Sequence, residues 1–316
     1  GWTGPSCGVL RVGPVPTSAE AAAYSGVIWP TNRNSTSWGG SVVPGPGGSH
    51  ELFVSNIADH CGMAAWQANS EILHATAPSL GGPYAQSDVV LGPFAHNANP
   101  LRLSQAPHKG DYAVFHVGSG PSGGSGHGGG RRLDCRNGTT PAKPPDSHRQ
   151  LNQIGDSKTC KPTENQSLPL SKTLRVPHAA SPRGPWSFEP QTCVGPALDP
   201  EPAGCPHFSN AAPLILANGT TLIVHSGCPG YQQHGLNLAI APQWTGPYRP
   251  AKGVDADGVN AWYTPSILTV TKTHPGGCTD PFLWMDLRGH YHALFHCHWT
   301  TGDQGGHAYS KDGRSW

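Results

Sequence analysis

Several strand starts in this sequence carry side chains that could do acid–base chemistry. Asp280 stands directly before a proline, where a carboxylate could act as a catalytic acid, ligate a metal ion, or accept backbone hydrogen bonds and fix a turn. His96 lies beside the start of one expected strand and His207 precedes another, and an imidazole at such a place could act as a general base. We therefore take Asp280, His96 and His207 as the candidate catalytic residues.

A second histidine group lies near the C-terminal end of the sequence. His292 and His296 are four residues apart on an expected strand, so both side chains lie on the same face. That face could bind a divalent metal ion, or supply the base of a lyase that abstracts a proton from a polysaccharide. The imidazoles could equally satisfy buried backbone groups. The sequence indicates no cofactor, and a metal at His292 and His296 is one of these open alternatives.

Amide and aromatic side chains at comparable places suit carbohydrate recognition. Asn97, Asn99 and Asn210 carry amides that could bind sugar hydroxyls, and Trp38 offers a ring on which a sugar could stack. The alternative for Trp38 is packing between neighbouring sheets. We take these four residues as candidate substrate-binding positions.

The elements that must position these residues form a repeat. Each unit reads as a strand, a turn, a second alternating strand, a third strand of small residues, and a Gly-containing turn that ends on an aromatic residue. The second strands are expected at 51–54, 112–115, 221–224 and 291–295, and the closing turns are Gly82-Pro83-Tyr84, Gly184-Pro185-Trp186, Gly246-Pro247-Tyr248 and Asp312-Gly313 with Trp316. A spacing of about 60 to 70 residues suits four-stranded propeller blades. We expect an all-β fold, a β-propeller with about four blades in this segment; the alternative is a β-sandwich.

The domain organisation follows from composition. Residues 119–171 are dominated by Gly, Ser, Pro, Lys and Asn, so we expect a long surface insertion within the second blade. Residues 1–10 resemble the last turn of an EGF-like module, residues 11–37 are a lead-in, and 38–316 form the propeller.

Charge and cysteine content restrict the function classes. The 20 basic residues nearly balance the 19 acidic ones, so nothing indicates a nucleic-acid partner, and no apolar run is long enough for a membrane span. Nine cysteines and four N-x-Ser/Thr sequons indicate an oxidising, extracellular location and a glycoprotein. The sequons are at Asn34, Asn137, Asn165 and Asn218, and the cysteines expected in disulfides are Cys61, Cys135, Cys160, Cys193, Cys205, Cys228, Cys278 and Cys297.

Proximity along the chain favours two particular disulfides. Cys135 with Cys160, and Cys193 with Cys205, would each close a short local loop. Cys7 would then pair with a cysteine outside this chain, in the EGF-like module.

The inner-strand motifs resemble those of a known family. Asn97-Ala98-Asn99-Pro100, Asn210-Ala211-Ala212-Pro213 and Asp280-Pro281, with the Gly-Pro-aromatic turns, look like the five-bladed propellers of glycoside hydrolase family 43, closest to an uncharacterised extracellular branch in algae and protists. Residues 310–316 also resemble the Asp-box hairpin of sialidase-like propellers. The resemblance implies five blades, of which a fifth would lie beyond Trp316.

The resemblance also implies inward-facing carboxylates, and here the sequence departs from the family. Glycosidic hydrolysis generally needs two carboxyl groups, whereas the matching strand starts carry Asn97, Asn210 and only one acid, Asp280. We therefore expect a secreted glycoprotein module that binds carbohydrate or forms part of an extracellular coat or filament through self-association or other matrix proteins. The alternative is a glycan-cleaving enzyme, either a family 43-like hydrolase or a histidine-dependent lyase.

Overall fold

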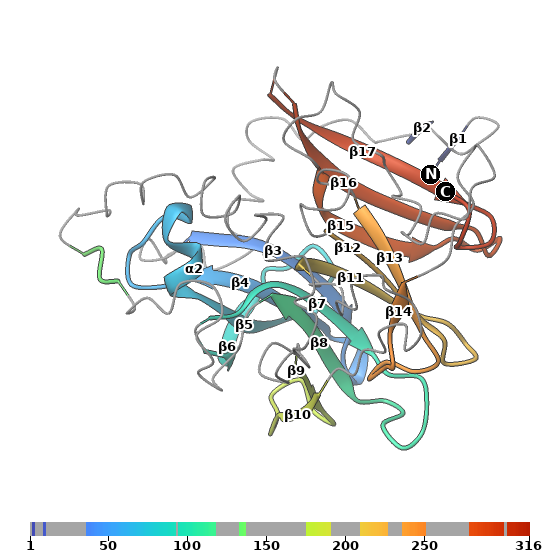
Figure 1. Ribbon diagram of the computed structural model, residues 1–316. Helices are drawn as coiled ribbons and strands as arrows, with labels where there is room; N and C mark the ends of the chain where they lie inside the picture. The colour runs from blue at the N-terminus through green and yellow to red at the C-terminus, as the bar shows by residue number, and fades with distance from the viewer. Residues whose placement is uncertain are drawn as a thin grey trace, which may run out of the picture. The chain divides into compact units, whose positions relative to one another are not determined.

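Within the residues that the structure describes, the regular structure is almost entirely antiparallel β-sheet. The computed structural model describes residues 2–3, 9–10, 36–92, 94–117, 133–136, 175–190, 209–226, 236–250, 278–299 and 302–316. The helical elements within these ranges are two short 3-10 turns and one four-residue helix: η1 (Pro46–Gly48), η2 (Met63–Ala65) and α2 (Trp66–Asn69). No helix in these ranges has the length and apolar character needed to span a membrane. The chain divides into two compact units, which are described separately (Figure 1).

Unit 2, residues 12–145 and 171–190, contains two four-stranded sheets in which consecutive strands are neighbours. The first sheet comprises β3 (Thr36–Pro44), β4 (His50–Ile57), β5 (Ser70–Ala77) and β6 (Ala85–Leu91). The second comprises β7 (His96–Arg102), β8 (Tyr112–Val117), β9 (Arg175–Ala179) and β10 (Ser187–Pro190). The edge strands β3 and β7 lie against one another, and fully buried Phe53, Ile72 and Tyr112 join the two sheets in one core.

Unit 1, residues 1–11, 146–170 and 191–316, repeats the arrangement. One sheet comprises β11 (Ser209–Ile215), β12 (Thr221–Ser226), β13 (Leu236–Ala241) and β14 (Arg249–Pro250); the next comprises β15 (Cys278–Met285), β16 (Tyr291–Trp299) and β17 (Gly302–Ser310); β1 (Trp2–Thr3) and β2 (Val9–Leu10) form a two-stranded sheet. Alternating apolar residues such as Leu222, Val224, Leu236 and Leu238 pack in one core with Phe295. The strands expected from the sequence are therefore present in both units.

The Gly-Pro-aromatic turns have one geometry throughout the repeat. Gly82, Gly184 and Gly246 have φ of 83°, 85° and 104°, a left-handed conformation that glycine adopts without a Cβ clash. The aromatic that follows then folds back: the Tyr84 hydroxyl donates to the Leu80 carbonyl at 2.9 Å, and that of Tyr248 donates to the Trp244 carbonyl at 2.6 Å. Tyr84 and Tyr248 are thus buried at the ends of their third strands, whereas Trp186 at the Gly184 turn is partly buried.

The long insertion connects two strands that are adjacent in one sheet. Residues 118–174 separate β8 from β9, and those strands pair through only two residue pairs, Tyr112 with Ala179 and Ala113 with His178. Of the insertion, residues 133–136 belong to the described ranges. These four residues are held to the loop after β4, because the Asn69 amide donates to the Leu133 carbonyl at 2.8 Å and accepts from the Leu133 amide at 3.0 Å.

This return of the chain corrects one expected disulfide. Cys135 pairs with Cys61, 74 residues away in sequence, and not with Cys160. Proximity along the chain was the wrong criterion, since the insertion folds back onto the first sheet. A second disulfide, Cys278–Cys297, joins directly opposite residues of β15 and β16. Cys160, Cys193, Cys205, Cys228 and Cys7, and with them the expected Cys193–Cys205 bridge, lie outside the described residues.

Candidate functional site

The first strand of each main sheet carries a β-bulge with one left-handed residue. The register of the first strand shifts between Trp38 and Gly40, between His96 and Asn99, between Ser209 and Ala212, and between Thr279 and Phe282. The residues at these bulges are Gly39, Asn97, Asn210 and Asp280, with φ of 50°, 53°, 53° and 50°. Gly, Asn and Asp are the residues that tolerate this conformation. Bulges redirect side chains and are frequent beside functional sites, so we take these positions as one candidate site in each unit: Gly39 and Asn97 in unit 2, and Asn210 and Asp280 in unit 1.

In unit 2 the bulges of β3 and β7 are in contact. A Cβ atom on Gly39 would lie 2.6 Å from the Asn97 side-chain oxygen, so only glycine fits beside this asparagine. The Asn97 backbone amide donates to the Ser55 hydroxyl at 2.8 Å, and the Asn99 amide lies 3.5 Å from the Asn97 carbonyl. Trp38 precedes the bulge and is 42% exposed, which leaves its ring available for stacking. Three of the predicted binding residues, Trp38, Asn97 and Asn99, are thus brought to one pair of strands.

His96, a predicted catalytic residue, is buried beside this bulge. Its Nδ1 lies 2.7 Å from the Ser70 hydroxyl, and its ring lies 4.9 Å from that of Trp66. Burial lowers the pKa of His96 to about 4, so the imidazole is neutral near pH 7. These contacts give it a structural role in the described part of the chain, and its catalytic role stays a prediction.

In unit 1 the bulges of β11 and β15 are joined through a hydrogen bond. The Asn210 amide donates to the Thr279 hydroxyl at 2.6 Å, one residue before Asp280. Asp280 Oδ2 lies 3.3 Å from His296 Nδ1, and both side chains are partly exposed, at 24% and 28%. The structure therefore places a carboxylate, an imidazole and an amide next to one another, a combination that can bind sugar hydroxyls or transfer a proton.

His292 has a different environment from its expected metal partner His296. It is fully buried, its ring stacks on Trp284 at 5.0 Å, and its Nδ1 lies 3.0 Å from His307 Nε2. Its Nε2 lies 3.5 Å from Asp286. Burial, followed by the nearby His292, lowers the pKa of His307. The two predicted metal ligands thus belong to separate clusters, and a metal that they share stays a prediction.

His207 and the four sequon asparagines are not among the bulge residues described above. His207 and the sequons at Asn34, Asn137 and Asn165 lie outside the described residues. Asn218 is exposed in the turn between β11 and β12, where its side-chain oxygen accepts from the Thr220 amide at 3.0 Å. An exposed turn is a suitable place for a glycan acceptor.

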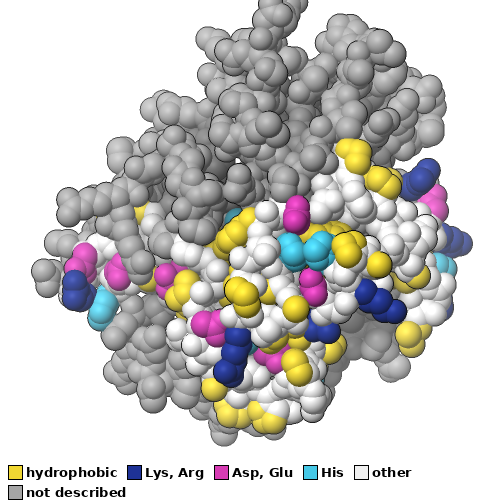
Figure 2. Space-filling model, turned by 90° about the horizontal axis from the view of Figure 1, so that it is seen from below, with side chains coloured by type: hydrophobic (Ala, Val, Ile, Leu, Met, Phe, Trp, Pro, Cys, Tyr) yellow, Lys and Arg dark blue, Asp and Glu magenta, His cyan; other side chains and the backbone are white. Residues whose placement is uncertain are grey.

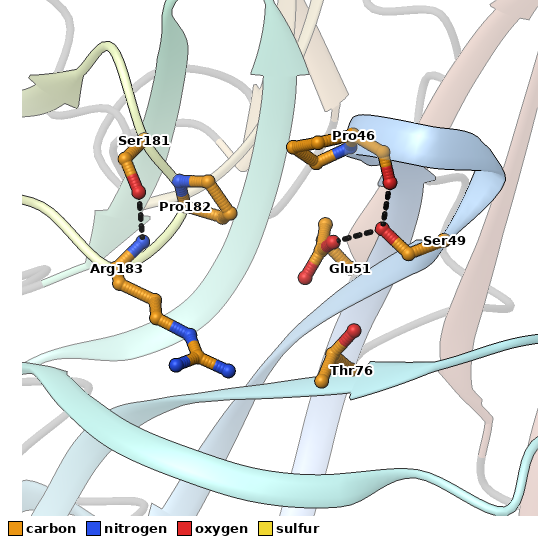
Figure 3. Close-up of a pocket in the computed structure, with 7 residues that line it drawn as sticks. All are labelled: Pro46, Ser49, Glu51, Thr76, Ser181, Pro182 and Arg183. Carbon is orange, nitrogen blue, oxygen red and sulfur yellow. Dashed lines mark hydrogen bonds between the residues drawn. The ribbon is translucent and has the colours of Figure 1, made fainter.

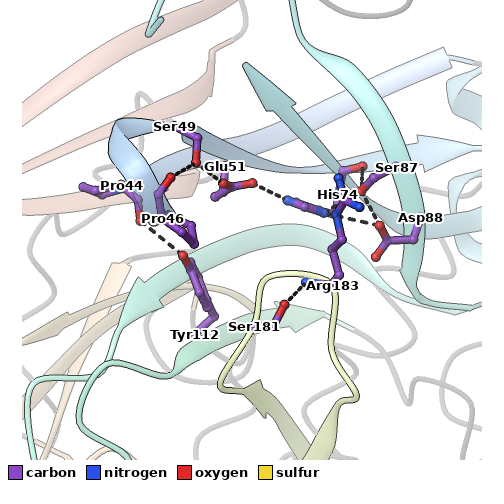
Figure 4. A network of polar contacts seen from close by, with 10 residues as sticks. All are labelled: Pro44, Pro46, Ser49, Glu51, His74, Ser87, Asp88, Tyr112, Ser181 and Arg183. Carbon is purple, nitrogen blue, oxygen red and sulfur yellow. Dashed lines mark hydrogen bonds and ion pairs between the residues drawn. The ribbon is translucent and has the colours of Figure 1, made fainter. Parts of the chain in front are cut away.

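A polar network centred on buried His74 in the first sheet was not predicted from the sequence. Glu51 Oε2 lies 2.7 Å from His74 Nε2, and the other nitrogen of His74 lies 2.6 Å from the Ser87 hydroxyl and 3.4 Å from Asp88 (Figure 4). His74 is fully buried. The residues come from three strands, and the register that aligns them cannot be read from the spacing of single residues. A histidine between a carboxylate and a hydroxyl can relay a proton, and here it also gives the buried Glu51 carboxylate a hydrogen-bond partner.

A small pocket opens on the other side of Glu51. Its volume is about 270 Å³, and it is lined by Pro46, Ser49, Glu51, Thr76, Ser181, Pro182 and Arg183 (Figure 3). The Ser49 hydroxyl lies within hydrogen-bonding distance of both the Glu51 carboxylate and the Pro46 carbonyl, which share its one proton. Because the Glu51 side chain is only 4% exposed, the pocket presents little free carboxylate, and we assign it no chemistry.

Comparison with known proteins supports the fold. No protein-family model and no curated protein sequence matches this chain. Among solved structures, a protein of unknown function from Dyadobacter fermentans matches with a TM-score of 0.50 and 14% identity, over 90% of this chain and 69% of that one. A thermostable family-43 glycoside hydrolase matches with a TM-score of 0.50 and 12% identity, over 90% and 75%. A family 117 glycoside hydrolase from Zobellia galactanivorans has a TM-score of 0.48 and 13% identity, over 89% and 68%.

The successive antiparallel sheets and the similarity to the first two solved structures point to the same fold. This chain has a β-propeller fold. In the described residues it contains three four-stranded sheets and one three-stranded sheet that correspond to blades. At 12 to 14% identity, these likenesses establish the fold alone.

Proposed function

We propose that this chain is an extracellular carbohydrate-binding module that binds a glycan at the bulge positions and does not cleave it. The observation that carries the proposal is the set of residues at those positions. Glycosidic hydrolysis generally uses a pair of carboxyl groups, about 5 to 10 Å apart. Three of the four equivalent bulges carry Gly39, Asn97 or Asn210, and Asp280 is the one acid.

The side chains around the bulges suit a sugar ligand. Amides donate and accept at once, as a sugar hydroxyl does, and Trp38 is exposed beside Gly39. In unit 1, Asn210 and the Asp280–His296 pair supply further polar groups. Each unit therefore presents one polar surface that could bind the glycan, and separate variants can test the two surfaces.

The disulfides support an oxidising location for the module. Cys61–Cys135 and Cys278–Cys297 are expected in secreted proteins, and the exposed sequon at Asn218 is compatible with a glycoprotein. Use of the module as a subunit of a coat or filament, through self-association, belongs to the same proposal.

A second candidate function rests on one contact. Asp280 and His296 are partly exposed and 3.3 Å apart, which is the arrangement of a carboxylate that orients a general base. In this alternative the chain is a lyase: His296 takes a C–H proton next to a carboxyl group of the glycan, a C=C bond forms as the glycosidic C–O bond breaks, and the leaving oxygen takes up a proton.

Binding to a panel of neutral and acidic polysaccharides, measured by affinity electrophoresis and calorimetry, tests the proposal. We expect Asn210→Gly and Trp38→Ala each to weaken binding about tenfold, because each removes one polar or stacking contact. Glycine keeps the left-handed backbone, as Gly39 shows in β3. Leu80→Ala, at a 67% exposed site on a turn, is the control.

The same panel separates binding from cleavage. If the chain only binds, we expect it to bind at least one polysaccharide of the panel and to release no oligosaccharides. Release that disappears in Asp280→Asn and His296→Gln would favour the enzyme. If the chain neither binds nor cleaves any of the polysaccharides, both candidate functions are wrong.

A further inference from the structure

A group of histidine and acidic side chains lies on one face of the second sheet of unit 2, away from the bulges. Two of its members, His178 on β9 and Glu189 on β10, come from adjacent strands. Two more, His108 and Asp111, lie in the connection between β7 and β8. None of these residues belongs to the polar surfaces described above.

The sheet register explains why they meet. His178 pairs with Ala113 of β8 on one side and with Ser187 of β10 on the other. Glu189 and Asp111 are each two residues from those partners, so their side chains lie on the same face, diagonal to His178. The connection then brings His108 back over this face, where its ring centroid lies 4.4 Å from that of His178.

The distances suit a small cation. One ligand atom from each of His108, His178 and Glu189 lies within 4.8 Å of the other two, and no other such group occurs among the residues the structure describes. His178 Nε2 lies 3.7 Å from Glu189 Oε1. With bonds of roughly 2.0 to 2.1 Å, ligands of a tetrahedral zinc ion are about 3.3 Å apart. A small adjustment of side chains would therefore let all three reach one ion.

Asp111 lies where a supporting carboxylate is needed. Its Oδ2 is 3.2 Å from Nδ1 of His108 and 3.5 Å from Nδ1 of His178. A carboxylate that accepts from Nδ1–H fixes the tautomer whose free lone pair is on Nε2, the usual support of a zinc-bound histidine. Asp111 thus orients the imidazole of His108 by a hydrogen bond, and a small shift would let the same carboxylate orient that of His178.

Charge and exposure agree with this assignment. Two carboxylates face two imidazoles, so with neutral rings the group carries a net negative charge that a dication would neutralise. The side chain of His178 is 9% exposed, whereas those of Asp111, His108 and Glu189 are 20%, 30% and 42% exposed. Figure 2, which views the side where β9 and β10 lie in Figure 1, shows histidine side chains between acidic ones.

We propose that His108, His178 and Glu189 bind a zinc ion, with Asp111 as the positioning residue of both histidines. Two imidazoles and one carboxylate suit Zn²⁺, and the exposed side leaves room for water as a fourth ligand. The ion would tie the β7–β8 connection to β9 and β10. It would do so where the long insertion leaves β8 and β9 joined by only two residue pairs.

Zinc titration of the full chain tests the proposal. The chain is stripped with a chelator, and Zn²⁺ is added in competition with a chromophoric chelator. We expect Glu189→Gln and His108→Gln each to lose one equivalent of bound zinc, or to bind it at least tenfold more weakly. Asp111→Asn should weaken binding about tenfold to a hundredfold. His60→Gln, at an exposed histidine outside the group, is the matched control and should bind as the parent does.

The titration can also overturn the proposal. Equal zinc affinity and stoichiometry in Glu189→Gln, His108→Gln and the control would place any bound zinc elsewhere in the chain. A parent chain that binds no zinc would exclude the site. Cobalt substitution gives a second readout: the visible absorption of tetrahedral Co²⁺ should appear in the parent and in His60→Gln, and be lost in Glu189→Gln.

Discussion

Glu51 and His74 face one another across β4 and β5, with Oε2 of the glutamate 2.7 Å from Nε2 of the histidine and almost no solvent contact for either. Glu51 pairs with Thr76 and His74 with Phe53, so the two residues are diagonal neighbours on one face. The Phe53 ring lies 5.0 Å from that of His74, and the Glu51 carboxylate contributes, after burial, to raising the pKa of Tyr84. This polar contact therefore lies within an apolar core.

Removing the carboxylate should destabilise unit 2 strongly. Breaking a buried pair leaves one partner uncompensated and costs about 3 to 5 kcal/mol, so we expect Glu51→Ala to lower the free energy of unfolding by that order. Glu51→Gln, which keeps a hydrogen-bonding group, should lower it less. Urea denaturation measures both. Asp88→Asn changes the partly exposed end of the same network and is the control, with an expected effect below about 1 kcal/mol.

The buried imidazole of His96 predicts a pH dependence of stability. Its pKa falls from 6.5 to about 4 on folding, so the unfolded chain binds a proton more readily than the folded one. The contribution is fully present above pH 6.5 and is lost as pH falls towards 4. The free energy of unfolding should therefore fall by on the order of 3 kcal/mol over this pH range because of His96. Thermal melts of the parent and His96→Gln between pH 7 and 4 should show a flatter profile for the variant. His60→Gln should keep the parental slope.

The left-handed bulge at Asn210 predicts a specific order among substitutions. Asn210→Gly and Asn210→Ala both remove the hydrogen bond to Thr279. Compared with glycine, alanine carries a Cβ that costs about 1 to 2 kcal/mol at φ 53°. We expect alanine to be the less stable variant by that amount, in chemical denaturation monitored through tryptophan fluorescence. Equal stability would mean that this bulge is not left-handed in solution.

The disulfide pairing can be checked directly. A digest of the unreduced chain should yield linked peptides for Cys61–Cys135 and Cys278–Cys297 in mass spectrometry. A Cys135–Cys160 peptide would contradict the fold-back of residues 133–136. Alkylation before reduction should label no more than one thiol, since an extracellular chain with nine cysteines leaves one to pair elsewhere.

Local signals in the sequence were enough for the fold. The alternating strands, the Gly-Pro-aromatic turns and the matched Asn97, Asn210 and Asp280 each depend on residues close together in the chain. Asn and Asp before a strand also have an intrinsic tendency to the left-handed conformation, which is why these equivalent positions could be found before the bulge itself was known.

Contacts that depend on register or on a long return of the chain could not be found in this way. Glu51 meets His74 only once β4 and β5 are aligned, and a shift of one residue would turn either side chain to the opposite face. Cys61 meets Cys135 because the insertion returns to the first sheet. His108, His178 and Glu189 combine both effects, since the insertion separates His108 from the other two.

The shared bulge has a consequence for how this fold acquires or loses activity. Asparagine and aspartate are nearly the same size and share a tolerance for the left-handed backbone, so each can replace the other there without moving the chain. The exchange alters one terminal group from an amide to a charged oxygen. Under the proposed function, point substitutions at Asn97 and Asn210 would therefore suffice to bring a carboxylate to a sugar-binding position on an unchanged scaffold.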